Sequence, residues 1–281
     1  MVCYLLILRK RMSMNDLKSK YGKIALVAGS SEGLGEAYCR ALASQGIDLV
    51  MIARRKDKLE AKAAEIRLEF GVKVITVVAD LADPEIIDTI TSTTYGLEID
   101  ILIYDAGMPY IGPFLDAPIS KHLDIARVNM LGPLRVVHHF GKAMVQRSRG
   151  AVVLMSSIAG FQGAGFLTTY ASTKAFNREL AESLWYEWKD KGVDVIACSG
   201  GTIATPDYLN THPEDIGFFA PPVQQPEDVV SECFEKLGKT PSFVSGMGNK
   251  LATFFMSTLM PRKTAISLMG DTTRKMYRIR Y

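Results

Sequence analysis

The chain has 281 residues, 48% of them hydrophobic, which is enough to bury one large α/β core. Its net charge is only +3, and basic side chains are mixed with acidic ones, which argues against a nucleic-acid-binding protein. No Pro/Gly/Ser-rich linker, repeat or low-complexity stretch divides the sequence. The cysteines lie far apart and form no CxxC pair, so we expect neither a zinc site nor a disulfide framework, and a reduced, cytoplasmic setting. They are Cys3, Cys39, Cys198 and Cys233.

The first residues combine an apolar run, Met1 to Leu8, with a basic cluster at residues 9–11. A secretory signal has the opposite order, and the run is too short to span a bilayer. We therefore interpret residues 1–20 as a leader that is disordered or peripheral. A small anchor that touches a membrane is the less favoured alternative.

From residue 23 onward, short apolar runs alternate with helical patterns. Strands are expected at residues 23–28, 48–53, 72–78, 99–104, 150–155, 193–198 and 242–245. Helices are expected at residues 36–44, 56–70 and 84–93, within 120–146, and at 170–191. This alternation predicts βαβ units, and strands that are apolar on both faces predict a sheet covered on both sides.

The sequence thus predicts a single-domain α/β fold, a doubly wound parallel sheet of the Rossmann type with helices on both faces. We assign residues 21–246 to the catalytic domain, with a substrate loop at residues 206–226. Residues 247–281 would form a helical, basic extension. Ligands of such sheets bind beyond the carboxyl ends of the strands, so the residues after each strand are the candidate site.

A glycine-rich loop lies between the first predicted strand and the first predicted helix. Its spacing is G-x-x-x-G-x-G. Glycines let the backbone turn sharply and approach a pyrophosphate, while a helix N-terminus offers unpaired N–H groups and a favourable dipole. We therefore expect a dinucleotide cofactor to contact Gly29, Ser31, Glu32, Gly33, Leu34 and Gly35.

The residues after the second and third strands bear on the choice of cofactor. An acidic residue after the second strand would bind the adenosine 2′-hydroxyl of NAD(H), but the chain has Arg54 and Arg55 there. Arg54 can pair with a 2′-phosphate, so we favour NADP(H) over NAD(H). Simple solvation of both arginines is the alternative. Asp80 is placed to accept from the adenine amine, and capping of the next helix is its alternative role.

Tyr170 and Lys174 lie four residues apart in a predicted helix and so share one face. A free phenol has a pKa near ~10, and a nearby ammonium lowers it by stabilising the phenolate. The spacing alone is common by chance, but Ser157 ends the preceding strand, where a hydroxyl can bind a substrate oxygen. Asn129 is a polar amide among apolar neighbours, a pattern typical of a helix irregularity, a bound water or a routine buried amide.

With these motifs in this order, residues 22–205 resemble the short-chain dehydrogenase/reductase family. The step of thirteen residues from Ser157 to Tyr170 agrees with the family pattern and selects Ser157 over Ser156. The matching elements are the glycine loop, Asp80, Asp105-Ala106-Gly107, Asn129, Ser157, Tyr170, Lys174 and the segment at residues 201–205.

The resemblance implies that Tyr170 exchanges a proton with the substrate oxygen and that Ser157 orients this oxygen. Lys174 would lower the pKa of Tyr170. Both Lys174 and Tyr170 would hold the nicotinamide ribose, and Asn129 would position a water that links Lys174 to solvent. The implied activity is the NAD(P)(H)-dependent interconversion of a ketone or aldehyde and an alcohol, without a metal, in a homodimer or homotetramer. Further cofactor contacts are implied at Leu81, Asp105, Ala106, Gly107, Ile203 and Thr205.

The chain departs from the family pattern at positions around the cofactor. Ala28 replaces a threonine, Glu32 a small residue, and Gly200 a proline, while Tyr104-Asp105 stands in place of two asparagines. A glutamate beside the cofactor phosphates is unfavourable unless it points outward. The Tyr104-Asp105 pair bears on local hydrogen bonding of the sheet.

The segments at residues 108–114, 159–166 and 206–226 are expected to form an apolar substrate pocket, with the last one as a lid. For residues 247–281 we favour a helix that packs on the core or on a partner subunit over a basic amphipathic surface helix. Membrane contact is thus the less favoured interpretation. Two rival functions remain: a silent NADP-binding sensor or scaffold, expected to lack the reactive side chains, and an epimerase or dehydratase of the same fold.

Overall fold

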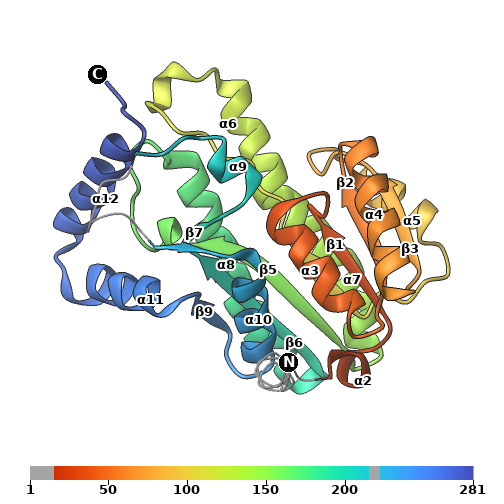
Figure 1. Ribbon diagram of the computed structural model, residues 1–281. Helices are drawn as coiled ribbons and strands as arrows, with labels where there is room; N and C mark the ends of the chain where they lie inside the picture. The colour runs from red at the N-terminus through yellow and green to blue at the C-terminus, as the bar shows by residue number, and fades with distance from the viewer. Residues whose placement is uncertain (1–15, 215–221, 281) are drawn as a thin grey trace, which may run out of the picture.

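A seven-stranded parallel sheet forms the middle layer of the computed structural model, which describes residues 16–214 and 222–280 (Figure 1). The strand order is β3-β2-β1-β4-β5-β6-β9, so the chain runs outward from β1 to one edge and then to the other. The strands are β1 (Ile24–Ala28), β2 (Asp48–Ala53), β3 (Val74–Val78), β4 (Ile101–Tyr104), β5 (Gly150–Ser157), β6 (Val193–Gly200) and β9 (Ser242–Val244).

The strands β1 to β6 contribute side chains to two separate apolar cores, one on either face of the sheet, while β9 contributes Phe243 to the first core. In β1, Ala25 and Val27 belong to one core, while Leu26 and Ala28 belong to the other. The first core is covered by α2 (Leu17–Tyr21), α3 (Gly33–Ala43), α4 (Lys56–Phe70) and α10 (Pro226–Lys236). The second is covered by α5 (Ile86–Thr93), α7 (Gly132–Gln146) and α8 (Thr168–Trp188). The predicted doubly wound α/β fold is confirmed.

Several element ends lie a few residues from their expected positions. Helix α3 begins at Gly33, inside the glycine loop and three residues before the predicted start. Strands β5 and β6 each continue two residues further than expected, to Ser157 and Gly200. Helix α4 ends as predicted before Gly71, whose φ of +68° closes the helix in the left-handed conformation that glycine adopts without strain.

The long helical stretch is interrupted where the polar amide occurs. It consists of α6 (Ile119–Ala126), a π-helical turn η2 (Arg127–Leu131) that contains Asn129, and α7. A π turn inserts one extra residue and shifts the hydrogen-bond pattern, and such turns are frequent at functional sites. Gly132 follows the turn, where any side chain would overlap the hydroxyl of Tyr104.

The boundary expected for the leader was wrong by several residues. Helix α2 begins inside the expected leader and ends at Tyr21, and it packs on the first core through Leu17 and Tyr21, which are 1% and 2% exposed. Leu17 and Tyr21 are four residues apart and so lie on one face of this short helix, which explains its attachment. Residues 1–15 lie outside the described residues.

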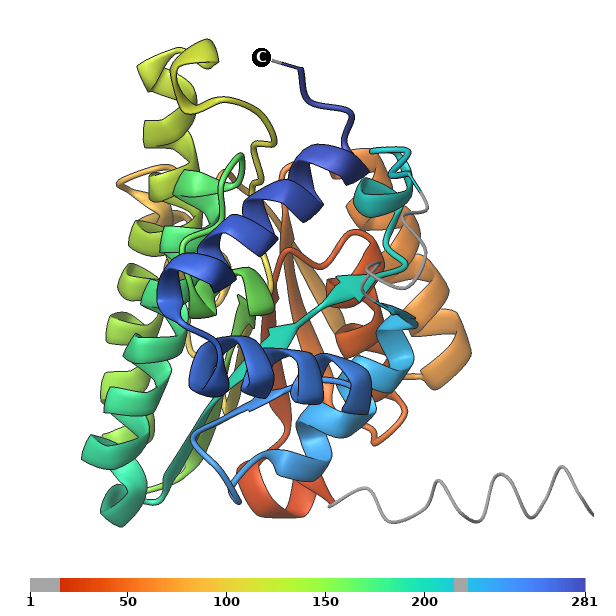
Figure 2. The ribbon, with the colours of Figure 1, turned by 90° about the vertical axis from the view of Figure 1, so that its left-hand side faces the viewer.

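The segments after β6 form a second small layer beside the carboxyl edge of the sheet (Figure 2). The two-stranded sheet of β7 (Thr202–Ile203) and β8 (Val223–Gln224) brackets α9 (Pro206–Leu209). Helix α11 (Met247–Phe254) runs into a π-helical turn η6 (Phe255–Leu259), and α12 (Arg262–Met276) returns across the face. The described residues also form the 3-10 turns η1 (Phe114–Asp116), η3 (Ile158–Phe161) and η4 (Lys189–Lys191).

Candidate active site

The predicted site residues meet at the carboxyl edge of the sheet. A Cβ on Gly29 would lie 2.6 Å from the backbone nitrogen of Ala106, and one on Gly33 would lie 3.1 Å from Cγ2 of Thr205. The glycine loop after β1, the segment after β4 and the segment after β7 are therefore in contact. Ile203 packs against the first core beside them.

The glycine loop has the shape that a dinucleotide phosphate requires. Gly29 and Gly33 have φ values of +93° and +59°, and a Cβ on Gly35 would overlap the carbonyl oxygen of Gly29. At the start of α3, Glu32 makes no side-chain capping bond, and the N–H of Gly35 donates to the Asp105 carboxyl, so the N–H groups of Gly33 and Leu34 are the ones left for a ligand. These residues fit the pyrophosphate of a nicotinamide dinucleotide.

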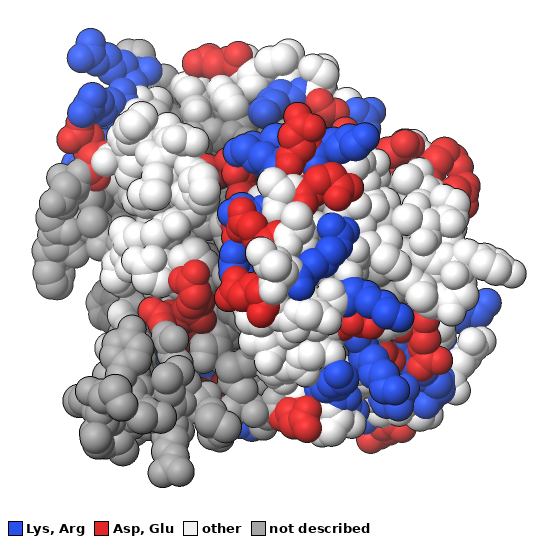
Figure 3. Space-filling view, turned by 45° about the vertical axis from the view of Figure 1, so that its right-hand side comes forward, with Lys and Arg blue, Asp and Glu red and all other residues white. Residues whose placement is uncertain are grey.

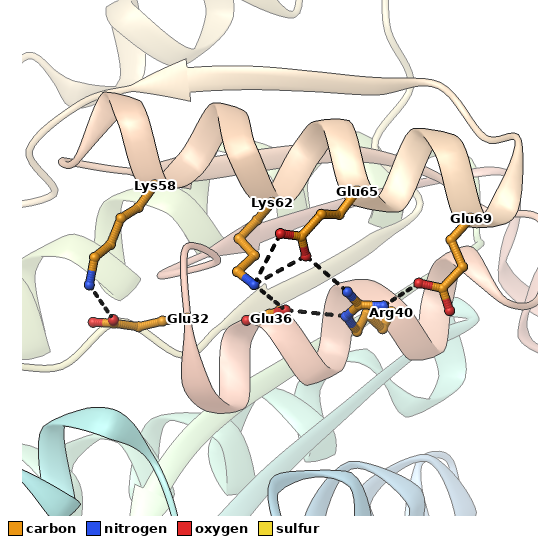
Figure 4. Close-up of polar contacts among 7 residues, drawn as sticks. All are labelled: Glu32, Glu36, Arg40, Lys58, Lys62, Glu65 and Glu69. Carbon is orange, nitrogen blue, oxygen red and sulfur yellow. Dashed lines mark hydrogen bonds and ion pairs between the residues drawn. The ribbon is translucent and has the colours of Figure 1, made fainter.

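The Glu32 carboxylate points away from the loop. It is neutralised by Lys58 of α4 and by Arg55, which immediately precedes α4. It pairs with Arg55, and Nζ of Lys58 lies 3.1 Å from its Oε2 (Figure 4). Burial opposes ionisation, but the hydrogen bonds from Arg55 and Lys58 hold the pKa of Glu32 below its ordinary value. The charge that looked unfavourable for phosphate binding is thus compensated within the protein. Arg54, by contrast, is exposed.

A chain of ion pairs continues from Glu32 along the contact between α3 and α4. Arg40 binds Glu36 at 3.2 Å and Glu65 at 3.1 Å and also pairs with Glu69 (Figure 4). Figure 3 shows basic and acidic side chains interspersed over the face that it presents. Networks of this kind hold two helices in register better than isolated surface pairs do.

Ser157 and Tyr170 form the polar centre of the site. Burial raises the pKa of the Tyr170 phenol to about 12, and a hydrogen bond with Ser157 acts in the opposite direction. The neighbouring Ser156 is turned the other way, because its Oγ donates to the carbonyl of Lys174 at 2.7 Å. The structure therefore separates the two serines as the spacing predicts: one faces Tyr170, and the other holds α8 to β5.

Lys174 is a buried cation, 4% exposed. Its Nζ donates to the carbonyl of Met155 at 3.0 Å and lies 5.6 Å from the centroid of the Tyr170 ring. Burial lowers the pKa of Lys174 to about 8, although the nearby Asp105 carboxyl opposes this shift. A cation held here can stabilise a phenolate, but its effect on the pKa of Tyr170 stays a prediction.

The side chain of Asn129 is fully used by protein partners. Its Oδ1 accepts from the backbone N–H of Met108 at 2.8 Å, and its Nδ2 donates to the carbonyl of Met108 and to Oγ1 of Thr173. Asn129 thereby ties the segment at residues 108–114 to α8. The water relay stays a prediction; with the side-chain amide occupied, such a water would have to bind the backbone of the π turn, where the altered pattern displaces carbonyl groups from their usual i+4 partners.

Asp80 follows the edge strand β3 and Asp105 follows the central strand β4, and their surroundings differ. Asp80 is exposed, and its Oδ1 accepts from the N–H of Ala82 at 3.0 Å; it caps this turn rather than α5. The backbone of Asp105 donates to Ala28 at 3.0 Å, and the hydroxyl of Tyr104 donates to Val128 at 2.7 Å. The replacement of both asparagines thus leaves the local hydrogen bonds intact.

Of the three expected substrate segments, residues 159–166 pack beside Tyr170 through Ala159 and Ala164. The N–H of Gly112 donates to the carbonyl of Phe166 at 2.9 Å, which joins residues 108–114 to residues 159–166. In the third segment, Thr205 caps α9 by accepting from Tyr208. Residues 215–221 of the predicted lid lie outside the described part of the chain.

Two groups that line this region were not found from the sequence. His122 is 6% exposed, stacks on Phe114, and bridges Oγ1 of Thr169 and the carbonyl of Phe114 at 2.8 Å each. Tyr277, after α12, lies close enough to Tyr170 that its charge raises the pKa of Tyr170. An isolated histidine and a distant terminal tyrosine carry no local pattern that could have identified them.

Comparison with known proteins places these features in a family. The family model described as short chain dehydrogenase matches residues 23–214. The chain belongs to the short-chain dehydrogenase family. It is 35% identical over 240 residues to a 7beta-hydroxysteroid dehydrogenase of Collinsella aerofaciens, covering 84% of this chain and 90% of that protein.

Solved structures agree with this assignment. A structure from a study of 7beta-hydroxysteroid dehydrogenase stereoselectivity has a TM-score of 0.84 and 32% identity, over 90% of this chain and 98% of the other. A short-chain dehydrogenase from Sphingobium yanoikuyae, in complex with NADPH, has a TM-score of 0.71 and 28% identity, over 79% and 87% of the two chains. This short-chain dehydrogenase is a nicotinamide-dependent oxidoreductase that interconverts a carbonyl compound and an alcohol.

The oxidoreductase prediction is thus confirmed, and neither the silent scaffold nor the epimerase finds support. The described residues include no group of three or more His, Cys, Asp or Glu side chains placed to hold a metal ion. Within the same part of the chain, no helix is both long and apolar enough to cross a membrane. Cys39, Cys198 and Cys233 are buried free thiols.

Proposed function

We propose that this short-chain dehydrogenase uses NADP(H) to interconvert a ketone and a secondary alcohol on a bulky apolar substrate of the hydroxysteroid class. The observation that carries the proposal is the apolar wall beside Tyr170, formed by Ala159, Ala164 and Met269 of α12. Such a wall favours a rigid hydrocarbon skeleton over a small polar ketone. The 7beta-hydroxysteroid dehydrogenase relative, which is similar over 84% of the chain, supports this class.

In the proposed mechanism, Tyr170 donates a proton to the substrate oxygen during reduction and accepts it during oxidation. Ser157 binds the same oxygen through its hydroxyl and so aligns it with the phenol. The ammonium of Lys174 stabilises the phenolate that forms when the proton leaves, and the low exposure of the site strengthens this interaction. The nicotinamide, when bound, supplies or accepts the hydride.

The cofactor contacts are proposed on the same basis. The loop from Gly29 to Gly35 would hold the pyrophosphate, and Asp80 with Leu81 would bind the adenine. Lys174 and Tyr170 would hold the nicotinamide ribose, with Ile203 and Thr205 beside the nicotinamide ring. Arg54 would pair with the 2′-phosphate, because its side chain is exposed while Arg55 is engaged by Glu32. The remaining contacts are at residues 105–107.

A steady-state comparison tests this proposal. We would measure kcat/KM with NADPH and NADH for a 7-oxosteroid, a 3-oxoacyl thioester and a small aliphatic ketone. The expected order places the 7-oxosteroid with NADPH first, by at least about tenfold, since a few buried methylenes are worth that factor. Preference for the thioester or the small ketone would contradict the substrate class, and equal use of NADH would contradict the cofactor.

We further propose that the enzyme acts in the cytoplasm as a homodimer or homotetramer. Reduced free thiols at Cys39, Cys198 and Cys233 are compatible with that compartment. The oligomer would form through the long helices, whose exposed leucines are considered below.

A further inference from the structure

Helix α11 and the π turn η6 have an inverted distribution of polar and apolar side chains. Asn249 and Thr253 face inward and are 1% and 7% exposed, and Nδ2 of Asn249 donates to the carbonyl of Ser245 at 3.0 Å. Gly201 lies directly beneath, since any side chain there would overlap the Asn249 amide. A helix on a water-exposed surface normally buries its apolar side and exposes its polar side. Here the arrangement is reversed.

The outer side carries large apolar side chains in one row, which we call the apolar stripe. Its members are Met247, Leu251, Phe254, Phe255 and Leu259, with exposures of 69%, 62%, 55%, 52% and 62%. The spacing of four, seven, eight and twelve residues from the first member places them on one helix face. In Figure 2, α11 lies on the face toward the viewer, and no described segment covers it. The stripe thus lacks the burial that such side chains require.

Basic side chains flank the stripe. Lys250 lies on α11 beside it, and Arg262 and Lys263 follow after the bend at Pro261; all three are exposed. Residues 247–281 contain seven basic side chains and one acidic one, a net charge of +6, while the whole chain has only +3. Three of the seven cations, at residues 250, 262 and 263, lie next to the stripe along the chain. The other four lie at the far end of α12 and after it, where Arg274 pairs with Asp271 and Arg278 pairs with Glu214.

We propose that the apolar stripe, with its basic flank, docks on the surface of an anionic lipid bilayer. Apolar side chains would enter the boundary between headgroups and acyl chains, and the ammonium and guanidinium groups would bind the lipid phosphates and carboxylates. A second copy of the chain is a poorer occupant, because a twofold contact would bring two sets of the same cations together. This inference does not depend on the substrate or cofactor proposed above.

Vesicle co-sedimentation of the full chain tests the proposal. We expect binding to vesicles of phosphatidylcholine with about one third phosphatidylserine, and weaker binding to phosphatidylcholine alone. Leu251→Glu/Phe255→Glu should lower the affinity for the anionic vesicles by at least about tenfold. Lys250→Gln should lower it about fivefold, which corresponds to about 1 kcal/mol for one charge at the surface.

A matched control keeps the result specific to the stripe. Leu68→Glu/Tyr95→Glu changes two apolar side chains that are 90% and 92% exposed elsewhere, and it should leave vesicle binding unchanged. Circular dichroism on each variant checks that the fold is retained. Failure to bind anionic vesicles would overturn the proposal, as would equal binding by the stripe variant.

Two further measurements separate the other occupants. Deletion of residues 1–14, which include the apolar run and its basic cluster, should leave most of the vesicle binding. If that deletion alone abolishes binding, the proposal is overturned in favour of the N-terminal segment. If sedimentation velocity shows that the stripe variant loses self-association instead, a second copy is the occupant and the proposal is wrong.

Discussion

Tyr170 is held in a setting that makes its own ionisation difficult. Burial raises its pKa to about 12, so the phenol keeps its proton at neutral pH until the substrate oxygen accepts it. Ser157 is the hydrogen-bond partner that counteracts this effect. Proton transfer by a positioned side chain contributes about 10²- to 10⁴-fold to the rate of such reactions.

We therefore expect Tyr170→Phe to lower kcat about 10²- to 10⁴-fold, because the ring remains but the proton donor is lost. The dissociation constant of NADPH should change little, and fluorescence titration of the cofactor would measure it. Ser156→Ala serves as the control, since its hydroxyl binds the carbonyl of Lys174 and not the phenol. Turnover by the Tyr170→Phe variant at the rate of the unchanged enzyme would exclude the mechanism.

Asp105 is a second group in this cluster with a shifted pKa. Burial raises its pKa to about 7, while the positive charge of Lys174 and a hydrogen bond from the backbone of Gly35 oppose the shift. Between about pH 4 and pH 7, the unfolded chain has therefore released a proton that the folded protein retains. Stability then falls as the pH rises through this window.

Asp105→Asn removes that dependence, because an amide does not titrate. We expect the variant to have the same free energy of unfolding as the unchanged protein at pH 4, and a free energy of unfolding about 1–2 kcal/mol higher at pH 7.5. Part of the gain is offset because Lys174 loses its attraction to the Asp105 carboxylate. Urea unfolding at both pH values would measure this. A difference of the same size at pH 4 and pH 7.5 would show that the carboxyl does not have the raised pKa.

Arg54 and Arg55 are adjacent in the sequence but have different partners. Arg54 is exposed, whereas Arg55 pairs with Glu32. We expect Arg54→Ser to lower kcat/KM for NADPH about tenfold or more, the value of a charge-assisted contact of 1.5–3 kcal/mol. The kcat and KM values measured with NADH should stay the same, because NADH has no 2′-phosphate.

Arg55→Ser is the matched comparison for this prediction. It should lower kcat/KM for NADPH and NADH by the same factor, because it leaves the Glu32 carboxylate without its Arg55 partner near the phosphates that both cofactors share. An NADPH-specific loss on Arg55→Ser and none on Arg54→Ser would reverse the assignment of the two arginines.

At the scale of elements, the sequence predicted what depends on local pattern. Apolar runs identified the strands of the sheet, and the thirteen-residue step identified Ser157 and Tyr170. It could not predict contacts between distant segments. The position of α12 beside Tyr170, and the use of the Asn129 side chain to hold residue 108, both arise from packing of elements that are far apart in the chain.

The end of α12 is tied to the substrate loop by such distant contacts. The N–H of Glu214 donates to the carbonyl of Met276 at 2.9 Å, and its carboxylate pairs with Arg278. Tyr277, between them, shares a hydrogen bond with Thr211. These contacts hold the described part of the loop at residues 206–226 against the end of the C-terminal helix.

Deletion of residues 277–281 should therefore raise KM for the carbonyl substrate about tenfold and leave the affinity for NADPH unchanged. The physical reason is that the loop loses about two hydrogen bonds of about 1 kcal/mol each, while the glycine loop is untouched. Arg280→Gln, at an exposed neighbouring position, is the control. A loss of NADPH affinity in the truncated protein would indicate general disruption rather than release of the substrate loop.

At the scale of the whole molecule, two apolar surfaces remain uncovered on separate faces. One is the apolar stripe of α11. The other runs along α6, the π turn and α7, which lie along one side of the molecule in Figure 2 and carry several exposed apolar side chains. They are Ile119, Leu123, Leu131 and Leu134, with exposures of 68%, 46%, 40% and 42%. Unlike the stripe, this surface lies far from the cationic segment in the sequence.

Such a row of apolar side chains along a long helix suits a twofold contact, because two copies of one helix can pack side by side. We expect the protein to sediment as a dimer or tetramer at micromolar concentration. Leu131→Lys/Leu134→Lys should dissociate it, since each interface would then contain paired, buried cations. The apparent Tm of the unchanged protein should rise with its concentration, as mass action requires. Leu68→Lys, at a more exposed site on α4 (90%), should alter neither property, and persistence of the oligomer in Leu131→Lys/Leu134→Lys would place the interface elsewhere.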